Sequence, residues 1–145
     1  GNPKKLKEFE RLLAPLGIEV FAQSAFNGPE APEPYCTFLE NALAKARNAA
    51  RHSGLPALAD DSGICVHALG GHPGVNSAYY AGQHKSDADN NAKLIKDLHG
   101  VKDRSAHYTA VLALALTEND PEPIIAEGRW FGEIIDTPRG SGGFG

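Results

Sequence analysis

The chain has few cysteines and no long apolar run. Its two cysteines, Cys36 and Cys65, lie far apart in apolar settings, and no CxxC pair occurs. We therefore expect reduced thiols and a cytoplasmic protein. The sequence shows no signal peptide and no apolar stretch of about 18 residues, so we expect no membrane-spanning segment.

The chain also lacks an excess of positive charge and the common phosphate-binding loops. Its net charge of −4 argues against a surface that coats nucleic acid, because that kind of binding needs many Lys and Arg side chains on one face. The G-x-x-x-x-G-K-S/T loop is absent. Gly140, Gly142 and Gly145 satisfy G-x-G-x-x-G, but no strand precedes them and no helix follows, so we reject a dinucleotide-binding motif.

The composition is that of a globular protein. With 145 residues, 41% hydrophobic and 22% charged, the chain is long enough for one domain with a real core. No internal repeat is present. The chain opens on Gly1, Asn2 and Pro3 without an initiator methionine and closes on the glycine-rich run GSGGFG, so we expect it to be truncated at both ends.

A first helix is predicted over residues 3–16, with Asn2 as its N-cap and proline at its first position. Lys5 falls within the apolar stripe of this helix. An inward lysine beside the free amide groups at the positive end of a helix is a phosphate-binding arrangement. The alternative is that Lys5 only passes the edge of the core. Gly17 is expected to end the helix, and residues 18–22 to form a short strand.

A second helix is predicted over residues 38–52, because Thr37 and Glu40 form a capping box. Lys45 lies at the border of its apolar face. Such a lysine either keeps its charge in solvent or reaches into a site at the edge of the core. The preceding proline-rich loop carries Glu33, which is either solvated or paired with a cation.

Two adjacent acids follow a predicted buried strand. Residues 55–59 are mostly apolar and would bring Asp60 and Asp61 to the carboxyl end of that strand, before a break at Ser62 and Gly63. Adjacent acids are costly in a core, because like charges repel and desolvation is expensive, so a bound cation or a proton-transfer role is favoured. The alternative is an exposed turn, for which Asp-Asp-Ser-Gly is also suitable.

The remaining elements are one helix and three strands. Residues 63–69 alternate as a further strand, and Ser86 caps a helix over residues 86–98. Residues 105–116 form an apolar strand too long for a sheet edge, and residues 123–135 return beside it. We expect these last two strands to form an antiparallel hairpin.

Four segments carry a family resemblance: GNPKK from residue 1, EPYCTFLENALAKA from residue 33, ADDSGICVHALGGHPGVNSAYYAG from residue 59 and SGGFG from residue 141. In order and spacing they resemble the inosine triphosphate pyrophosphatases, the noncanonical purine NTP pyrophosphatases also called Ham1 or RdgB-like. The resemblance implies an α/β fold, an elongated two-lobed mixed sheet flanked by helices with the nucleotide in the cleft.

The resemblance also implies an activity. Enzymes of this family hydrolyse ITP, deoxy-ITP and XTP to the monophosphate and pyrophosphate, which removes deaminated purines from the nucleotide pool. They need a divalent cation, Mg²⁺ or Mn²⁺, and are typically homodimers. From the net charge and the lack of a long apolar run, we expect no nucleic-acid or membrane partner.

The resemblance assigns roles to particular residues. Asp61 matches the general base, which also lies at the metal, and Glu33 matches the loop acid that joins it there. Asp60 has no such match, and we add it as a further candidate ligand because it is adjacent to Asp61. Lys45 and Lys5 match lysines near the triphosphate, and Lys45 is also a candidate catalytic residue. The other implied substrate contacts are Gly1, Asn2, Ser62, Phe144 and Gly145.

The chain departs from the family pattern at its ends. The strand before Gly1, the tyrosine-aspartate-proline continuation after Gly145 and the later segment that reads the purine base are missing. We therefore expect residues 1–145 to form a single nucleotide pyrophosphatase domain without its first strand and its C-terminal base-recognition segment. The alternatives are a Maf-type nucleotide pyrophosphatase, a nucleotide-binding module without turnover, and a scaffold in which the acids are turn residues.

Overall fold

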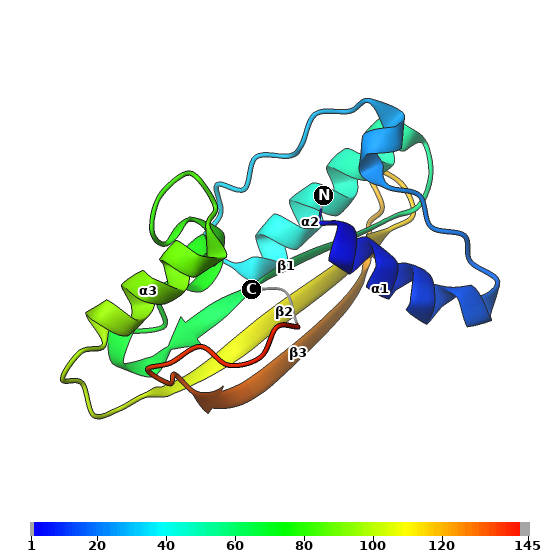
Figure 1. The fold of residues 1–145 in the computed structure, drawn as a ribbon. Helices are drawn as coiled ribbons and strands as arrows, with labels where there is room; N and C mark the ends of the chain where they lie inside the picture. The colour runs from blue at the N-terminus through cyan, green and yellow to red at the C-terminus, as the bar shows by residue number, and fades with distance from the viewer. Residues whose placement is uncertain (1, 143–145) are drawn as a thin grey trace.

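A three-stranded antiparallel sheet forms the centre of the structure. The computed structural model describes residues 2–142, and its sheet has the order β1-β2-β3 (Figure 1). The strands are β1 (Ala57–Val66), β2 (Ser105–Ala115) and β3 (Ile124–Glu133). The predicted hairpin of β2 and β3 is confirmed, and β2 lies between the other two strands, as its apolar sequence predicts.

Within residues 2–142, three α-helices and four short 3₁₀ turns accompany the sheet. The helices are α1 (Pro3–Leu13), α2 (Phe38–Ser53) and α3 (Asp87–Asp97). The turns are η1 (Ala14–Leu16), η2 (Gln23–Phe26), η3 (His67–Leu69) and η4 (Gly74–Tyr79). Each α-helix begins where the sequence predicts, because the side chains of Asn2, Thr37 and Ser86 accept a hydrogen bond from a backbone N–H of the first turn.

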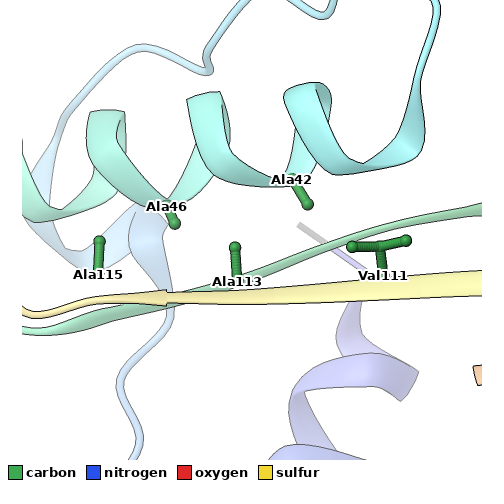
Figure 2. Packing of buried hydrophobic residues seen from close by; sticks show 5 residues of the cluster. All are labelled: Ala42, Ala46, Val111, Ala113 and Ala115. Carbon is green, nitrogen blue, oxygen red and sulfur yellow. The ribbon is translucent and has the colours of Figure 1, made fainter. Parts of the chain in front are cut away.

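Small side chains let α2 pack closely on the sheet. Figure 2 shows Ala42 and Ala46 of α2 facing Val111, Ala113 and Ala115 of β2. In the same view the faint blue helix α1 lies on the other side of the strands. The two faces of the sheet near the middle of β1 are therefore covered by different helices. A second cluster joins α3 to the far end of the sheet through Val66, Leu94, Leu98 and Ala106.

Three predicted features differ from the structure. Residues 18–22 have no strand partner and run as irregular chain, and α1 ends at Leu13, followed by η1, whose end is marked by Gly17 at φ +72°. The predicted break at Ser62 and Gly63 is wrong, because β1 continues through both residues to Val66 and takes in much of the predicted strand 63–69. Pairing with β2 outweighs the local turn preference of Asp-Asp-Ser-Gly. Among residues 2–142 no helix is long and apolar enough to cross a membrane.

Candidate active site

Asp61 is a buried carboxylate in the middle of β1. It pairs in register with Val111, which lies under α2, so its side chain lies on the α2 face of the sheet. The residue is 8% exposed, and its Oδ2 atom has no hydrogen-bond partner in the described part of the chain. A buried, unsatisfied carboxylate oxygen is costly, which is typical of a functional group and not of a structural one.

Lys45 joins Asp61 to the acid loop, which is the proline-rich chain at residues 27–35 that carries Glu33 and precedes α2. Its Nζ atom lies 2.6 Å from Glu33 Oε1 and 3.4 Å from Asp61 Oδ1. Burial raises the pKa of Asp61 and outweighs the opposing charge of Lys45, while Glu33 raises that pKa further. Burial acts to lower the pKa of Lys45. The hydrogen bond to Glu33 and the negative charges of Asp61, Glu33 and Asp60 outweigh this effect, so the pKa of Lys45 is raised. The structure thus brings together three of the predicted site residues, a lysine with two carboxylates.

Two asparagines of α2 hold the acid loop in place. Asn41 is 1% exposed, and its side chain accepts from the Tyr35 N–H and donates to the Tyr35 carbonyl, both at 3.1 Å. Asn48 donates to the Pro29 carbonyl at 2.8 Å. Glu33 lies between these two anchor points. The sequence signal for this role is Asn41 itself, because a polar amide on the apolar face of α2 needs a buried hydrogen-bond partner.

A second group of polar side chains lies on the opposite face of β1. Lys5 Nζ of α1 donates to Asp60 Oδ2 at 2.6 Å and to Ser62 Oγ at 3.1 Å. The Tyr108 hydroxyl of β2 lies 3.3 Å from Ser62 Oγ. The predicted inward orientation of Lys5 is present, and Tyr108 is a member of the group that the sequence pattern does not single out.

Asp60 is not brought together with Glu33 and Asp61. Successive side chains of a strand point to opposite faces of the sheet, and Asp60 pairs with Lys5 while Asp61 faces Lys45. Within residues 2–142 no three His, Cys, Asp or Glu side chains are grouped so that they could hold a metal ion together. The grouping of all three acids on one metal therefore has no support from the geometry of the described residues, because alternation along β1 directs Asp60 and Asp61 to opposite faces.

The remaining predicted contacts are at the two ends of the chain. Asn2 uses its side chain as the N-cap of α1, where Oδ1 accepts from the Lys4 N–H at 2.9 Å. Gly1, Phe144 and Gly145 lie outside the described residues.

The turn η4 packs directly on Gly63, two residues after Asp61 in β1, a feature that the sequence analysis missed. Gly63 lies so close to η4 that it has no room for a side chain. A Cβ atom at this position would lie 2.3 Å from the Gly74 carbonyl oxygen and 2.5 Å from Ser77 Oγ. Ser77 Oγ also accepts from the Ile64 N–H at 2.9 Å. The glycine after Ser62 therefore serves close packing, where the sequence suggested a turn.

The two carboxylates on the α2 face fit a hard divalent cation. Mg²⁺ is commonly held by one or two carboxylates together with substrate phosphates and water. Glu33 and Asp61 converge on the same lysine, and the unpartnered Oδ2 of Asp61 is a free oxygen of the kind that such an ion binds.

Comparisons with known proteins agree with these features. The model of the Ham1 family matches residues 1–145. A dITP/XTP pyrophosphatase of Ralstonia nicotianae is 64% identical over 148 residues, which cover all of this chain and 74% of the relative, and one of Bordetella pertussis is 61% identical with 70% of its length covered. The structure of a HAM1 protein from Coxiella burnetii superposes with a TM-score of 0.92 at 47% identity, over 99% of this chain and 74% of that one.

Proposed function

Because this chain belongs to the Ham1 family, we propose that it hydrolyses deaminated purine nucleoside triphosphates such as dITP, XTP and ITP to the monophosphate and pyrophosphate. The observation that carries the proposal is the buried Asp61 with its unpartnered oxygen, which Lys45 links to Glu33 of the acid loop. In this proposal the enzyme acts on free nucleotides in the cytoplasm. It also forms the homodimer that the resemblance implies, and the molecular mass measured by sedimentation tests this.

Asp61 is the general base of this reaction. It accepts a proton from a water molecule as the water oxygen bonds to the phosphorus next to the nucleoside, and the bond from that phosphorus to the pyrophosphate oxygen breaks. Burial raises the pKa of Asp61, which brings its basicity closer to that of an efficient base near neutral pH.

Lysines balance the charge of the substrate. A triphosphate carries about four negative charges near neutral pH, and the acids of the site would repel it. The pKa of Lys45 is raised, so this lysine stays protonated. Its ammonium group donates hydrogen bonds to the phosphates, which compete with Glu33 for the same donor. On the other face of β1, Lys5 and the free amide groups at the start of α1 offer a second anion-binding position, with Ser62 beside them.

Glu33 and Asp61 are the residues that would hold the divalent cation, Mg²⁺ or Mn²⁺. When bound, such an ion neutralises phosphate charge and lowers the pKa of coordinated water. The donor set is made of carboxylate oxygens and contains no thiolate or imidazole, which favours Mg²⁺ or Mn²⁺ over softer metals.

A substrate panel tests the proposal. The full-length protein is incubated with dITP, XTP, ITP, GTP and ATP, and pyrophosphate release is measured with Mg²⁺ and with EDTA. We expect release from the deaminated nucleotides, little from ATP, and none with EDTA. A preference for pyrimidine or methylated nucleotides would favour the Maf-type alternative, and binding without release would favour a module without turnover.

A further inference from the structure

Tyr108 of β2 lies beside the polar group on the α1 face of the sheet, which is the face opposite to α2. Its hydroxyl is 3.3 Å from Ser62 Oγ, although the two residues are 46 positions apart in the chain. In the register of the sheet Tyr108 pairs with Ile64, and Ser62 pairs with Ala110. Tyr108 and Ser62 are therefore diagonal neighbours on one face, and the long aromatic side chain spans the separation between their backbones.

Small residues leave this face open beside Ser62. Ser62 pairs with Ala110, and Ala110 pairs with Gly128 of β3, so this row across the sheet carries only a methyl group and a hydrogen after the serine. A Cβ atom at Gly128 would meet no atom within 4 Å in the described part of the chain. Tyr108, in the next row, is 39% exposed. A ligand therefore has room beside the Ser62 and Tyr108 hydroxyls.

The hydrogen-bonding capacity of Ser62 defines what Tyr108 can do. A serine hydroxyl has one hydrogen and two lone pairs. Lys5 Nζ lies 3.1 Å from Ser62 Oγ, and an ammonium group can only donate, so this contact occupies one lone pair. The Tyr108 contact uses either the second lone pair or the hydrogen of Ser62. A phenol is more acidic than an alcohol and is the better donor, which favours a hydrogen bond from Tyr108 to Ser62.

With this arrangement Ser62 accepts twice, and its own hydrogen is available for a ligand. At 3.3 Å the contact with Tyr108 is long for two hydroxyl groups, as is common in active sites before the ligand binds. Lys5 also forms an ion pair with Asp60 Oδ2 at 2.6 Å, so an anion has to compete with a carboxylate for this lysine. The Ser62 hydrogen is a donor for which a phosphate oxygen meets no such competition.

We propose that Tyr108 is a positioning residue for substrate binding, whose hydroxyl donates to Ser62 Oγ and so turns the Ser62 hydrogen toward a phosphate oxygen of the nucleoside triphosphate. Ser62 and Lys5 then offer the phosphate one neutral and one charged donor from adjacent positions. The resemblance implies that Ser62 contacts the substrate, whereas the role of Tyr108 comes from the geometry of the sheet. The inference rests on the proposed function for the identity of the substrate, and its ligand chemistry is that of a phosphate group.

The test compares Tyr108→Phe, Ser62→Ala and the double variant in the full-length protein. Tyr80→Phe is the matched control, because it also removes a hydrogen-bonded hydroxyl, the one that donates to Asp97 at 2.6 Å. Steady-state hydrolysis of dITP gives kcat and KM, and calorimetric titration with inorganic triphosphate and Mg²⁺ gives the affinity for the phosphate chain. We expect Tyr108→Phe to raise KM and to weaken triphosphate binding about fivefold, with kcat within about twofold of wild type. Tyr80→Phe should change neither.

The double variant shows whether Tyr108 acts through Ser62. Ser62→Ala should itself raise KM, and Tyr108→Phe should have no further effect once Ser62 is alanine, so the double variant should match Ser62→Ala. A hydroxyl that only supports the fold would give the same loss in both backgrounds, and that result would overturn the inference. An unchanged KM in Ser62→Ala would also overturn it. Tyr108→Phe keeps the aromatic ring, and thermal unfolding of each variant checks that the fold is intact.

The outcomes separate the two proposals. If Tyr108→Phe binds triphosphate as tightly as wild type, or if it lowers kcat with KM unchanged, the inference about Tyr108 is overturned while the proposed function stands. If the wild-type protein releases no pyrophosphate from dITP or XTP, the proposed function fails. The calorimetric titrations of wild type, both single variants and the double variant then still decide whether Tyr108 supports phosphate binding through Ser62.

Discussion

Replacing Asp61 with asparagine is expected to abolish most activity without weakening the fold. The amide keeps the shape of the side chain but cannot accept a proton from water, so we expect kcat to fall about 100-fold or more, which corresponds to roughly 2.7 kcal/mol of transition-state stabilisation. Lys45 keeps its partner Glu33 at 2.6 Å, so the change leaves no buried unpaired charge.

The stability effect follows from the raised pKa of Asp61. In the folded protein this pKa lies above its ordinary value of 3.8, so the folded state binds the proton more tightly than the unfolded chain does. The stabilisation from protonated Asp61 is complete below pH 3.8 and is lost as the pH rises through the folded-state pKa. At pH 7 the ionised carboxylate therefore costs stability. Asp61→Asn removes this cost, so we expect the variant to be at least as stable as wild type at pH 7.

Two measurements test this reasoning. Pyrophosphate release from dITP gives the activity, and urea unfolding at pH 7 and at pH 3.5 gives the free energy of unfolding. Glu118→Gln, a change of an exposed acid in the β2–β3 turn, serves as the control and should alter neither. Wild-type turnover by Asp61→Asn would refute the assignment of the base. A loss of more than about 1 kcal/mol at pH 7 would refute the conclusion that the carboxylate is destabilising.

Two further substitutions test the supports of the site. Gly63→Ala places a Cβ 2.3 Å from the Gly74 carbonyl oxygen, so we expect a loss of about 1–3 kcal/mol in urea unfolding, whereas the control Gly128→Ala on β3 meets no atom within 4 Å and should be nearly neutral. Equal effects of the two changes would contradict the close packing of η4. Asn41→Ala removes both hydrogen bonds to Tyr35, and we expect about 2 kcal/mol of destabilisation and a higher Mg²⁺ concentration for half-maximal activity. Unchanged Mg²⁺ dependence would show that the acid loop does not need this anchor.

Local sequence signals predicted the starts of the helices and the hairpin. Asn2, Thr37 and Ser86 act through hydrogen bonds to amides two or three residues away, so the sequence alone identifies them. The hairpin of β2 and β3 is likewise evident from an apolar run over residues 105–116, followed by a turn and a second strand-like run over residues 123–135. The family resemblance rests on the same kind of contiguous motif and is confirmed by the family match over residues 1–145.

The arrangement of the site depends on contacts between residues far apart in the chain. The Asp-Asp-Ser-Gly stretch has the local character of a turn, and pairing with β2 makes it part of a strand. The alternation of that strand then separates Asp60 from Asp61 and assigns one to Lys5 and the other to Lys45.

The sequence by itself thus determined where the helices begin, which residues form the hairpin and to which family the chain belongs, because each of these depends on neighbouring residues. Only the tertiary structure decided which acid faces which lysine, how Asn41 anchors the loop of Glu33, and why a glycine follows Ser62. These features depend on strand register and on close packing between distant segments, which local propensities do not specify.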